Sequence, residues 1–514
     1  MKKLLTVAVC ILAVCFCASA ENSILIKGGT VYDGGTGEPY KADVLIKGNT
    51  ISKIGKCSAK KVDKVIDATG MVVCPGFIDP HSHVNANMVK EQYKHNKGYL
   101  CMGVTTVLCG VCGGSPVPVS KQADKLQEQG FGTNIGYFIG LGSVRKKVIG
   151  STDREPTAEE LEKMKKLVKA AMEWGAFGVS SGLIYTPGCF AKTDELIELT
   201  KVAAPYGGIY TTHMRNEGNN VLQSLDEAFK IGNEAGVAVN ISHMKCTSKM
   251  KGHSDLMMAK MDSARRAGMR LTGDQYPFTA SSTSLTATVL PKWASAAGRK
   301  GYLRMFKDED TLAMIKKTVK RNIGSAKGTN LFFSNYCKDE AIRGLTLAEI
   351  AEKWNMDATD AAIEVLRRSA PSAIKFIIDE DDMRNIMKQP WTMTGTDGSV
   401  GGHPRSFSTY TLKIRKFVLE EKIITLDEMI RRSTGMVAET YGIPKRGFIR
   451  EGYYADVLVF NPSDLKDNAD YRNPRELSTG FKAVIVNGEV AVDESRPTEA
   501  LAGMIVKMDN SYKK

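Results

Sequence analysis

A β-α unit of about thirty residues repeats through the middle of the chain and limits the folds open to it. The helix-like stretches of this region end near four glycines, Gly175, Gly207, Gly236 and Gly268. These glycines are 32, 29 and 32 residues apart, and strand-like segments follow them: AFGVSSGL, GIYTTH, VAVNISH and RLTGDQY. Strands that alternate with helices predict a parallel sheet, and so many consecutive units predict closure into an α/β (β/α)8 TIM-like barrel. An open, doubly wound sheet is the alternative, but no G-x-G-x-x-G follows the first strand.

Both ends of the chain show another pattern, in which turns separate short apolar runs. SILIKGGTVYDGG and ADVLIKGNTISKIG lie near the beginning, and ADVLVFNP and AVIVNGEVAVD near the end. These runs predict hairpin strands, and Asn487-Gly488 predicts a two-residue turn. We therefore expect a small β-sandwich domain built from residues 21–74 and 442–514, with the barrel at residues 75–441 between them. Residues from about 285–343 break the period and predict an inserted subdomain.

The first twenty residues have the layout of a cleaved secretory signal peptide. Lys2 and Lys3 precede an uncharged apolar stretch, and Ala18-Ser19-Ala20 ends the segment. No later uncharged apolar run reaches the roughly 18 residues of a spanning helix, so we expect an exported protein, periplasmic or secreted, without a stable membrane span. A lipoprotein is less favoured, because the three cysteines of this segment do not follow the small residue that lipoprotein processing requires.

The charge balance favours small anionic molecules or envelope polymers as partners rather than nucleic acid. The chain has 70 basic and 57 acidic residues, a formal net charge of +13, without a run of five or six like charges. The cysteines that remain after the signal peptide do not have the regular spacing of a disulfide-bonded framework. Cys109 and Cys112, however, form a C-x-x-C motif. This pair predicts either a disulfide or a metal ligand. The sequence does not indicate the oligomeric state.

Potential metal ligands stand where the predicted barrel strands stop. Four of the seven histidines of the chain lie at such ends. The complete set is His81, His83, Cys112, His213, His243 and Asp397. Barrel enzymes carry their catalytic groups at the carboxyl ends of the strands, and imidazole, thiolate and carboxylate together form a zinc-type ligand set. Alternative interpretations are a helix cap for Asp397, a buried thiol for Cys112 and a structural role for His403.

Nine segments of the chain, in order, resemble the D-aminoacylases (N-acyl-D-amino-acid deacylases) of the amidohydrolase superfamily. They are PGFIDPHSH, GVTTVLCGVCG, GVSSGLIYTPG, THMRNEG, ISHMKC, DQYPFTASST, TGTDG, HPRSF and YGIPKRGFIREGYYADVLVFNP. The resemblance covers nearly the entire chain after the signal peptide. It implies a zinc-dependent amidohydrolase that converts an N-acyl-D-amino acid to a carboxylate and a free D-amino acid.

The resemblance also implies roles for individual residues. Cys112, His213 and His243 would hold one tightly bound zinc ion. His81 and His83 would hold a weaker second metal, with Cys112 as a bridge. Asp397 would be the catalytic acid/base next to the metal. The residues that would bind substrate are Arg405, which would grip the carboxylate, and Tyr185, Lys245, Tyr276 and Ser282.

Two other functions stay open at this point. A cyclic amidase of the dihydroorotase or hydantoinase type uses the same barrel, but such enzymes usually carry a carboxylated lysine on the fourth strand, where this chain reads FGVSSGL. A non-catalytic envelope protein that binds a metal or a ligand would lack the acid/base, whereas Asp397 is present. The chain also has Leu141 in GLGS, where many D-aminoacylases have a histidine, so the acyl group and the preferred side chain stay open.

Overall fold

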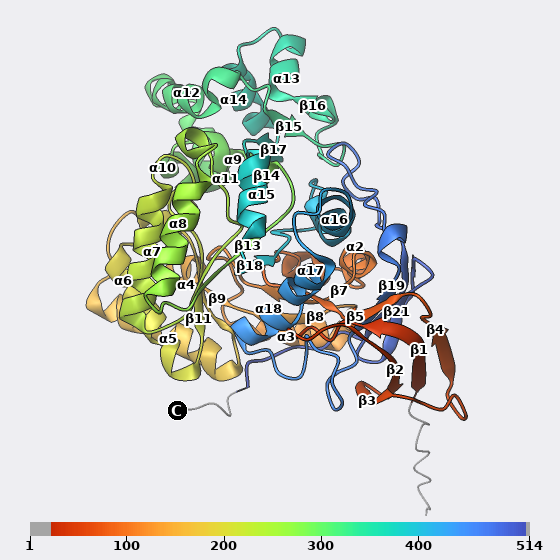
Figure 1. Ribbon diagram of the computed structural model, residues 1–514. Coiled ribbons are helices and arrows are strands. Elements are labelled where there is room, and N and C mark those ends of the chain that lie inside the picture. The colour runs from red at the N-terminus through yellow and green to blue at the C-terminus, as the bar shows by residue number, and fades with distance from the viewer. Residues whose placement is uncertain (1–21, 510–514) are drawn as a thin grey trace, which may run out of the picture.

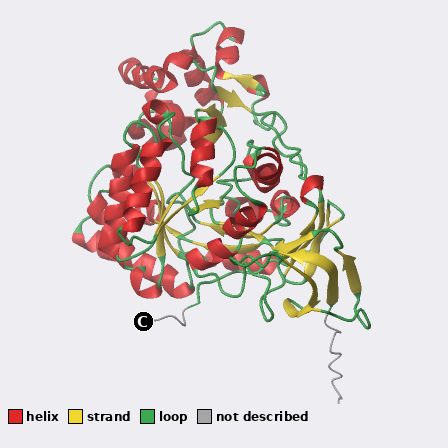
Figure 2. Ribbon diagram, in the orientation of Figure 1, coloured by secondary structure: helices red, strands yellow, loops and turns green. Residues whose placement is uncertain are grey.

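The computed structural model describes residues 22–509, so the predicted signal peptide lies outside the described residues. Parallel strands form a barrel at the centre (Figures 1 and 2). In order they are β6 (Phe77–Asp79), β7 (Val104–Cys109), β8 (Asn134–Tyr137), β9 (Ile139–Gly140), β10 (Gly178–Gly182), β11 (Ile209–His213), β12 (Val239–Ile241), β13 (Leu271–Gln275) and β18 (Thr392–Thr394). β8 and β9 are separated only by Phe138 and together form one strand position of the barrel. The barrel therefore has the eight strand positions that were predicted.

Loop residues beyond the ends of β6 and β18 close the barrel. Ser82 and Gly398 form a parallel bridge, and the His83 amide donates to the Gly398 carbonyl at 2.7 Å. The Asp397 amide donates to the His81 carbonyl at 2.8 Å. Closure therefore takes place among the predicted metal ligands themselves, and it fixes His83 and Asp397 side by side.

Amphipathic helices cover the outside of the barrel (Figure 2). They include α4 (Leu141–Val148), α5 (Ala158–Trp174), α6 (Thr193–Lys201), α7 (Val221–Ala235), α8 (Ser254–Arg266), α15 (Glu380–Lys388), α16 (Arg405–Leu412), α17 (Leu426–Ser433) and α18 (Gly435–Tyr441). α5 begins with a complete capping box between Thr157 and Glu160. It ends at Gly175 with φ 110°, a left-handed conformation that favours glycine. Among the described residues, no helix is both long and apolar enough to cross a membrane.

The two ends of the chain build one nine-stranded sheet beside the barrel (Figure 1). Its strands are β1 (Ser23–Val31), β2 (Tyr40–Lys47), β3 (Thr50–Gly55), β4 (Lys64–Asp67), β5 (Val72–Pro75), β19 (Val457–Phe460), β20 (Phe481–Val486), β21 (Glu489–Asp493) and β22 (Arg496–Pro497). β5 and β19 pair antiparallel and join the two ends, and both ends contribute to one apolar cluster. Asn487 and Gly488, at φ 47° and 82°, form the predicted tight turn between β20 and β21.

The inserted region is longer than predicted. A second antiparallel sheet contains β14 (Ala280–Ser284), β15 (Leu331–Phe333), β16 (Leu345–Thr346) and β17 (Ser372–Phe376). With α9 (Leu285–Val289), α12 (Glu309–Ile323), α13 (Leu347–Lys353) and α14 (Ala358–Arg368), it encloses its own apolar cluster, which extends from Leu285 to Ala373. The predicted limit at residue 343 falls inside this cluster. α13 and α14 are amphipathic like the barrel helices, so the sequence pattern does not separate them from the barrel.

The last described residues leave the β domain to which they were assigned. The Ile135 amide donates to the Met504 carbonyl at 3.0 Å, and the Val506 amide donates to the Ile135 carbonyl at 2.8 Å. Val506 and Met508 are buried in an apolar cluster with Phe138 and Phe177. Residues 502–508 of the predicted β segment therefore pack along β8 of the barrel.

Candidate metal centre

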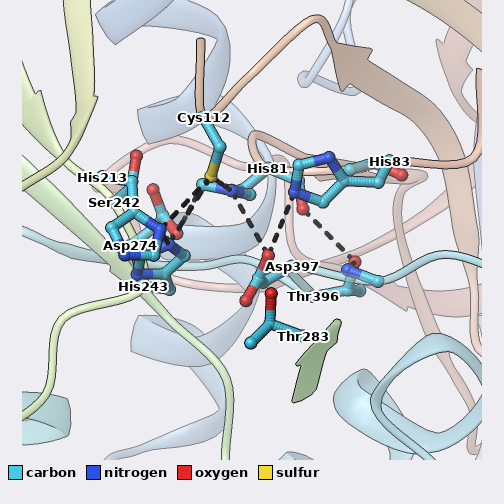
Figure 3. A network of polar contacts seen from close by, with 12 residues as sticks. His81, His83, Cys112, His213, Ser242, His243, Asp274, Thr283, Thr396 and Asp397 are labelled. Atoms are coloured by element: carbon cyan, nitrogen blue, oxygen red, sulfur yellow. Dashed lines mark hydrogen bonds and ion pairs between the residues drawn. The ribbon is translucent and has the colours of Figure 1, made fainter. Parts of the chain in front are cut away.

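The six predicted ligands come together at the carboxyl ends of the barrel strands (Figure 3). They form two groups within which the potential ligand atoms all lie within 4.8 Å of one another. One group contains Cys112, His213 and His243, and the other contains His81, His83, Cys112 and Asp397. Cys112 belongs to both, so its Sγ is placed to bridge two metal ions.

The distances in the first group fit a zinc ion. Cys112 Sγ lies 3.7 Å from His213 Nδ1 and 3.6 Å from His243 Nε2. A tetrahedral ion with Zn–S of about 2.3 Å and Zn–N of about 2.0–2.1 Å separates S and N by roughly 3.5 Å. The two imidazole nitrogens are 2.8 Å apart, closer than the roughly 3.4 Å of the same geometry, so a small ring rotation is needed. Three protein ligands leave one position for water or substrate, which is typical of catalytic zinc.

The second group is arranged around Asp397 Oδ1. This oxygen lies 3.1 Å from His83 Nε2 and 3.5 Å from His81 Nε2, and His81 Nε2 lies 3.2 Å from Cys112 Sγ. Three nitrogen or sulfur donors and one carboxylate oxygen therefore surround a single point. This mixed donor set also suits a divalent transition metal.

The backbone is strained at three of these residues. Cys112, His243 and Asp397 have φ values of 51°, 34° and 49°, in the left-handed region that L-residues rarely adopt. Each such conformation costs about 1–3 kcal/mol and persists only where the surroundings impose it. Buried carboxylates hold the chain at His243 and next to Asp397. Asp274 accepts the His243 amide at 2.8 Å, and Asp79 accepts the amides of His81 at 3.1 Å and Thr396 at 3.0 Å.

Cys112 is a free cysteine, and its surroundings favour the thiolate. All eight described cysteines, including Cys109 and Cys112, are free. Burial raises the pKa of Cys109 to about 12. Burial also opposes ionisation of Cys112, but the charge of His81 and hydrogen bonds from His213 and His243 outweigh it, so its pKa lies well below the usual range.

Two carboxylates that the sequence analysis missed support the histidines. Glu217 Oε1 accepts from Lys245 Nζ at 2.7 Å and lies 3.0 Å from His243 Nδ1, and Oε2 lies 3.5 Å from His213 Nε2. Asp274 Oδ1 lies 3.4 Å from His81 Nδ1. Each carboxylate thus lies beside the ring nitrogen that does not point at the metal position, where a carboxylate can orient the ring. Within residues 22–509, His81 Nδ1 and His213 Nε2 make no hydrogen bond at these distances. Acidic residues within THMRNEG and DQYPFTASST were the only sequence signal for them.

A cavity of about 460 Å³ opens onto the second group of ligands. Of the predicted substrate residues, Tyr185, Ser282 and Arg405 line it, together with His83, Cys112 and Asp397. Arg405 Nη1 donates to Asp397 Oδ2 at 2.7 Å, and Nη2 donates to the Ser282 carbonyl at 3.1 Å. Burial opposes ionisation of Asp397, yet Arg405 and His243 together hold its pKa well below the usual range. Asp397 is therefore a carboxylate. It does not cap the next helix, α16, which begins at Arg405 with Pro404 as its N-cap.

Lys245 and Tyr276 lie behind the wall of the catalytic cavity and not in its lining, where the substrate residues were predicted. Lys245 is buried and paired with Glu217, so it contacts the ligand His243 rather than the cavity. Arg405 lies over the Tyr276 ring at 5.0 Å, and the Tyr276 hydroxyl is buried without a hydrogen-bond partner among residues 22–509. His403 has the predicted structural role, because Nε2 contacts the Ala280 carbonyl at 3.0 Å and Nδ1 accepts the Arg405 amide at 3.1 Å.

Comparison with known proteins places these features in a family context. A model of the amidohydrolase family matches residues 64–326 and 337–492. The chain is 32% identical to an N-acyl-D-glutamate deacylase of Alcaligenes xylosoxydans xylosoxydans, over 95% of this chain and 97% of that protein. It is 29% identical to a D-aminoacylase of the same organism, over 95% of this chain and 98% of that protein. The crystal structure of N-acyl-D-glutamate deacylase from Bordetella bronchiseptica, complexed with zinc and a phosphonate inhibitor, matches with a TM-score of 0.81 at 28% identity, covering 95% of this chain and 99% of that one.

Proposed function

The chain belongs to the amidohydrolase family and is a hydrolase of amide bonds related to the N-acyl-D-amino-acid deacylases, and from this premise we propose that it is a zinc-dependent deacylase of N-acyl-D-amino acids. Its products would be a carboxylate and a free D-amino acid. The observation that carries the proposal is the position of Cys112 in two ligand groups, next to the Asp397–Arg405 pair in one cavity.

The ligands would be used as follows. Cys112, His213 and His243 would hold a tightly bound zinc ion, and His81 and His83 a second metal bridged by Cys112. A bound zinc ion supplies Lewis-acid chemistry, because it acidifies water and polarises a carbonyl. The pKa of Cys112 lies well below its usual range, so this ligand is already the thiolate that zinc binding needs. Burial opposes the charged form of His213, but Glu217 and Cys112 outweigh it and raise its pKa to about 9, so this imidazole would lose a proton on zinc binding.

Asp397 would transfer the proton. Its Oδ2 accepts from Arg405, which leaves Oδ1 on the side of His81 and His83. A carboxylate there can take a proton from the attacking water and return it to the nitrogen of the leaving amine. Because the pKa of Asp397 lies well below its usual range, the carboxylate is in its basic form at neutral pH.

Arg405 would bind the substrate carboxylate. A guanidinium offers a planar pair of donors that matches a carboxylate, and a lysine would match it less well. Arg405 stands at the cavity wall over Tyr276, with a hydrogen bond to Ser282 that fixes its plane. With the amide at the metal position and the carboxylate at Arg405, the two configurations at the α-carbon direct the side chain to different walls, so such a site distinguishes D- from L-substrates.

The two rival functions have less support. A cyclic amidase would need the carboxylated lysine on the fourth strand, and β10 contains only glycine, valine and serine. A non-catalytic binding protein would not need the buried Asp397–Arg405 pair.

Amine release from matched N-acetyl-D- and N-acetyl-L-amino acids tests the proposal. The zinc-loaded protein should hydrolyse only the D series, a strong chelator should abolish the reaction, and added zinc should restore it. If protein with bound zinc and a reduced Cys112 hydrolyses neither series, the proposal is refuted.

We further propose that the protein is exported and cleaved after Ala20. The support is the layout of Lys2, Lys3, the apolar stretch and Ala18-Ser19-Ala20. N-terminal sequencing of the mature protein should begin at Glu21, and an intact Met1 in the active protein would contradict export by this route.

A further inference from the structure

A second cavity adjoins the catalytic cavity on the side of Arg405. Its volume is about 250 Å³, and it shares four lining residues with the first cavity: Ser282, Ser372, Gly401 and Gly402. The rest of its wall comes from the inserted region, mainly residues 334–339 and 369–371, and from Arg475 near the C-terminus. The inserted region thus extends the binding space beyond the reacting groups.

The second cavity is positively charged. Arg475 Nη2 donates to the Val400 carbonyl at 2.7 Å, and its guanidinium lies 4.2 Å from the centre of the Tyr336 ring. Lys338 also lines this cavity. Within residues 22–509, neither Arg475 nor Lys338 has a carboxylate oxygen within 4 Å. The acid of this wall, Asp339, is neutralised by Arg368, whose Nε lies 3.0 Å from it.

The shared wall shows which part of a substrate would enter. The Ser282 carbonyl accepts from Arg405, the residue proposed to bind the α-carboxylate. The second cavity therefore lies on the amino-acid side of the amide. The part of the catalytic cavity that the second cavity does not share, which includes Gly142, Ser143, Lys146 and Gly188, is left for the acyl group. With the α-carboxylate at Arg405 and the acyl group in the unshared part of the catalytic cavity, the side chain of the D-residue is left to extend into the second cavity.

We propose that this cavity is a subsite for the anionic end of a long side chain, so that the enzyme accepts N-acyl-D-amino acids whose side chain carries a further, carboxylate-terminated unit. The assignment rests on the proposed deacylase function and adds the substrate class. A D-glutamate whose γ-carboxyl is amide-linked to another amino acid has this chemistry. Arg475 and Lys338 would bind the terminal carboxylate, and Tyr336 would hold the guanidinium plane in place.

Two substrates that differ only in charge test the subsite. They are N-acetyl-D-glutamate with glycine on the γ-carboxyl, and the same compound with glycinamide. The protein should prefer the glycine compound by about tenfold in kcat/KM, the effect of one partly solvated charge-assisted contact, and the preference should shrink at high salt. The preference should disappear in a Lys338→Glu, Arg475→Met variant. It should persist in Lys307→Ala, which removes an exposed lysine of the same inserted region that lines neither cavity.

Three results would overturn the assignment. Equal rates for the glycine and glycinamide compounds, with N-acetyl-D-methionine hydrolysed, would refute the subsite and leave the deacylase function intact. A preference that survives in the double variant would place the charge recognition elsewhere. Hydrolysis of none of these compounds would refute the deacylase function, and the subsite with it.

Discussion

Glu217 should control zinc affinity although it does not touch the metal position. Its carboxylate lies 3.0 Å from His243 Nδ1, 3.5 Å from His213 Nε2 and 2.7 Å from Lys245 Nζ. Removal of a single outer carboxylate typically weakens metal binding by about 10–100-fold, or about 1.4–2.7 kcal/mol. Because one carboxylate serves two of the three ligands here, we expect Glu217→Ala to fall near the upper limit. Glu217→Gln keeps an acceptor for His243 and should lose less.

The assay is zinc affinity by competition with a chelator, with zinc content per chain measured in parallel. Thermal unfolding of the metal-free variants would show whether they are folded, because Glu217→Ala leaves Lys245 buried without its partner. Glu234→Ala is the matched control, since Glu234 is a solvent-facing glutamate at the end of α7 whose one ion pair within residues 22–509 is with Lys230. A folded Glu217→Ala protein that binds zinc as tightly as Glu234→Ala would refute the reasoning.

Three more predictions concern catalysis and stability. Asp397→Asn should bind zinc but lose about 10²–10⁴-fold in kcat, which steady-state deacylation assays would measure; near-normal turnover would exclude Asp397 as the acid/base. Glu195→Ala should lower the free energy of unfolding by about 3–5 kcal/mol in denaturant titrations. The substitution leaves the guanidinium of Arg145, whose side chain is 1% exposed, buried without its carboxylate partner. A loss below about 1 kcal/mol would contradict this prediction. Burial lowers the pKa of Lys413 to about 7 from an ordinary 10.5. Between these two pH values the unfolded chain binds more protons than the folded protein, so the free energy of unfolding falls as the pH drops from 10.5 to 7. Lys413→Met should therefore stabilise the protein more at pH 7 than at pH 10, by at most about 1.4 kcal/mol per pH unit, and equal effects at both pH values would refute the burial argument.

The barrel and its ligands could be predicted because both leave local signals. Helix ends at glycine recur with the β-α period, and side chains at strand ends lie next to the apolar runs that define the strands. Cys112 and Asp397 each stand three residues beyond the end of the preceding strand, where the chain turns with positive φ. Position after a strand still identified them, because the turn does not carry them away from the strand end.

What could not be predicted depends on contacts between distant segments. Glu217 reaches His243 beyond the next strand, and Asp274 reaches His81 beyond the first strand, and one sequence contains no record of such pairings. The inserted region extends past residue 343 because its later helices have the same amphipathic pattern as barrel helices. The return of residues 502–508 to β8 combines backbone hydrogen bonds with the burial of Val506 and Met508, and two apolar residues in sequence do not show which strand they pack against.

X-ray absorption at the zinc edge of the loaded protein tests the central claim most directly, namely that Cys112, His213 and His243 hold the metal at which the amide is hydrolysed. We predict one sulfur at about 2.3 Å and two imidazole nitrogens at about 2.0–2.1 Å. In Cys112→Ser the sulfur signal should disappear together with the activity on N-acetyl-D-amino acids. A loaded, active protein without a sulfur ligand, or a Cys112→Ser protein that keeps full activity, would contradict the account.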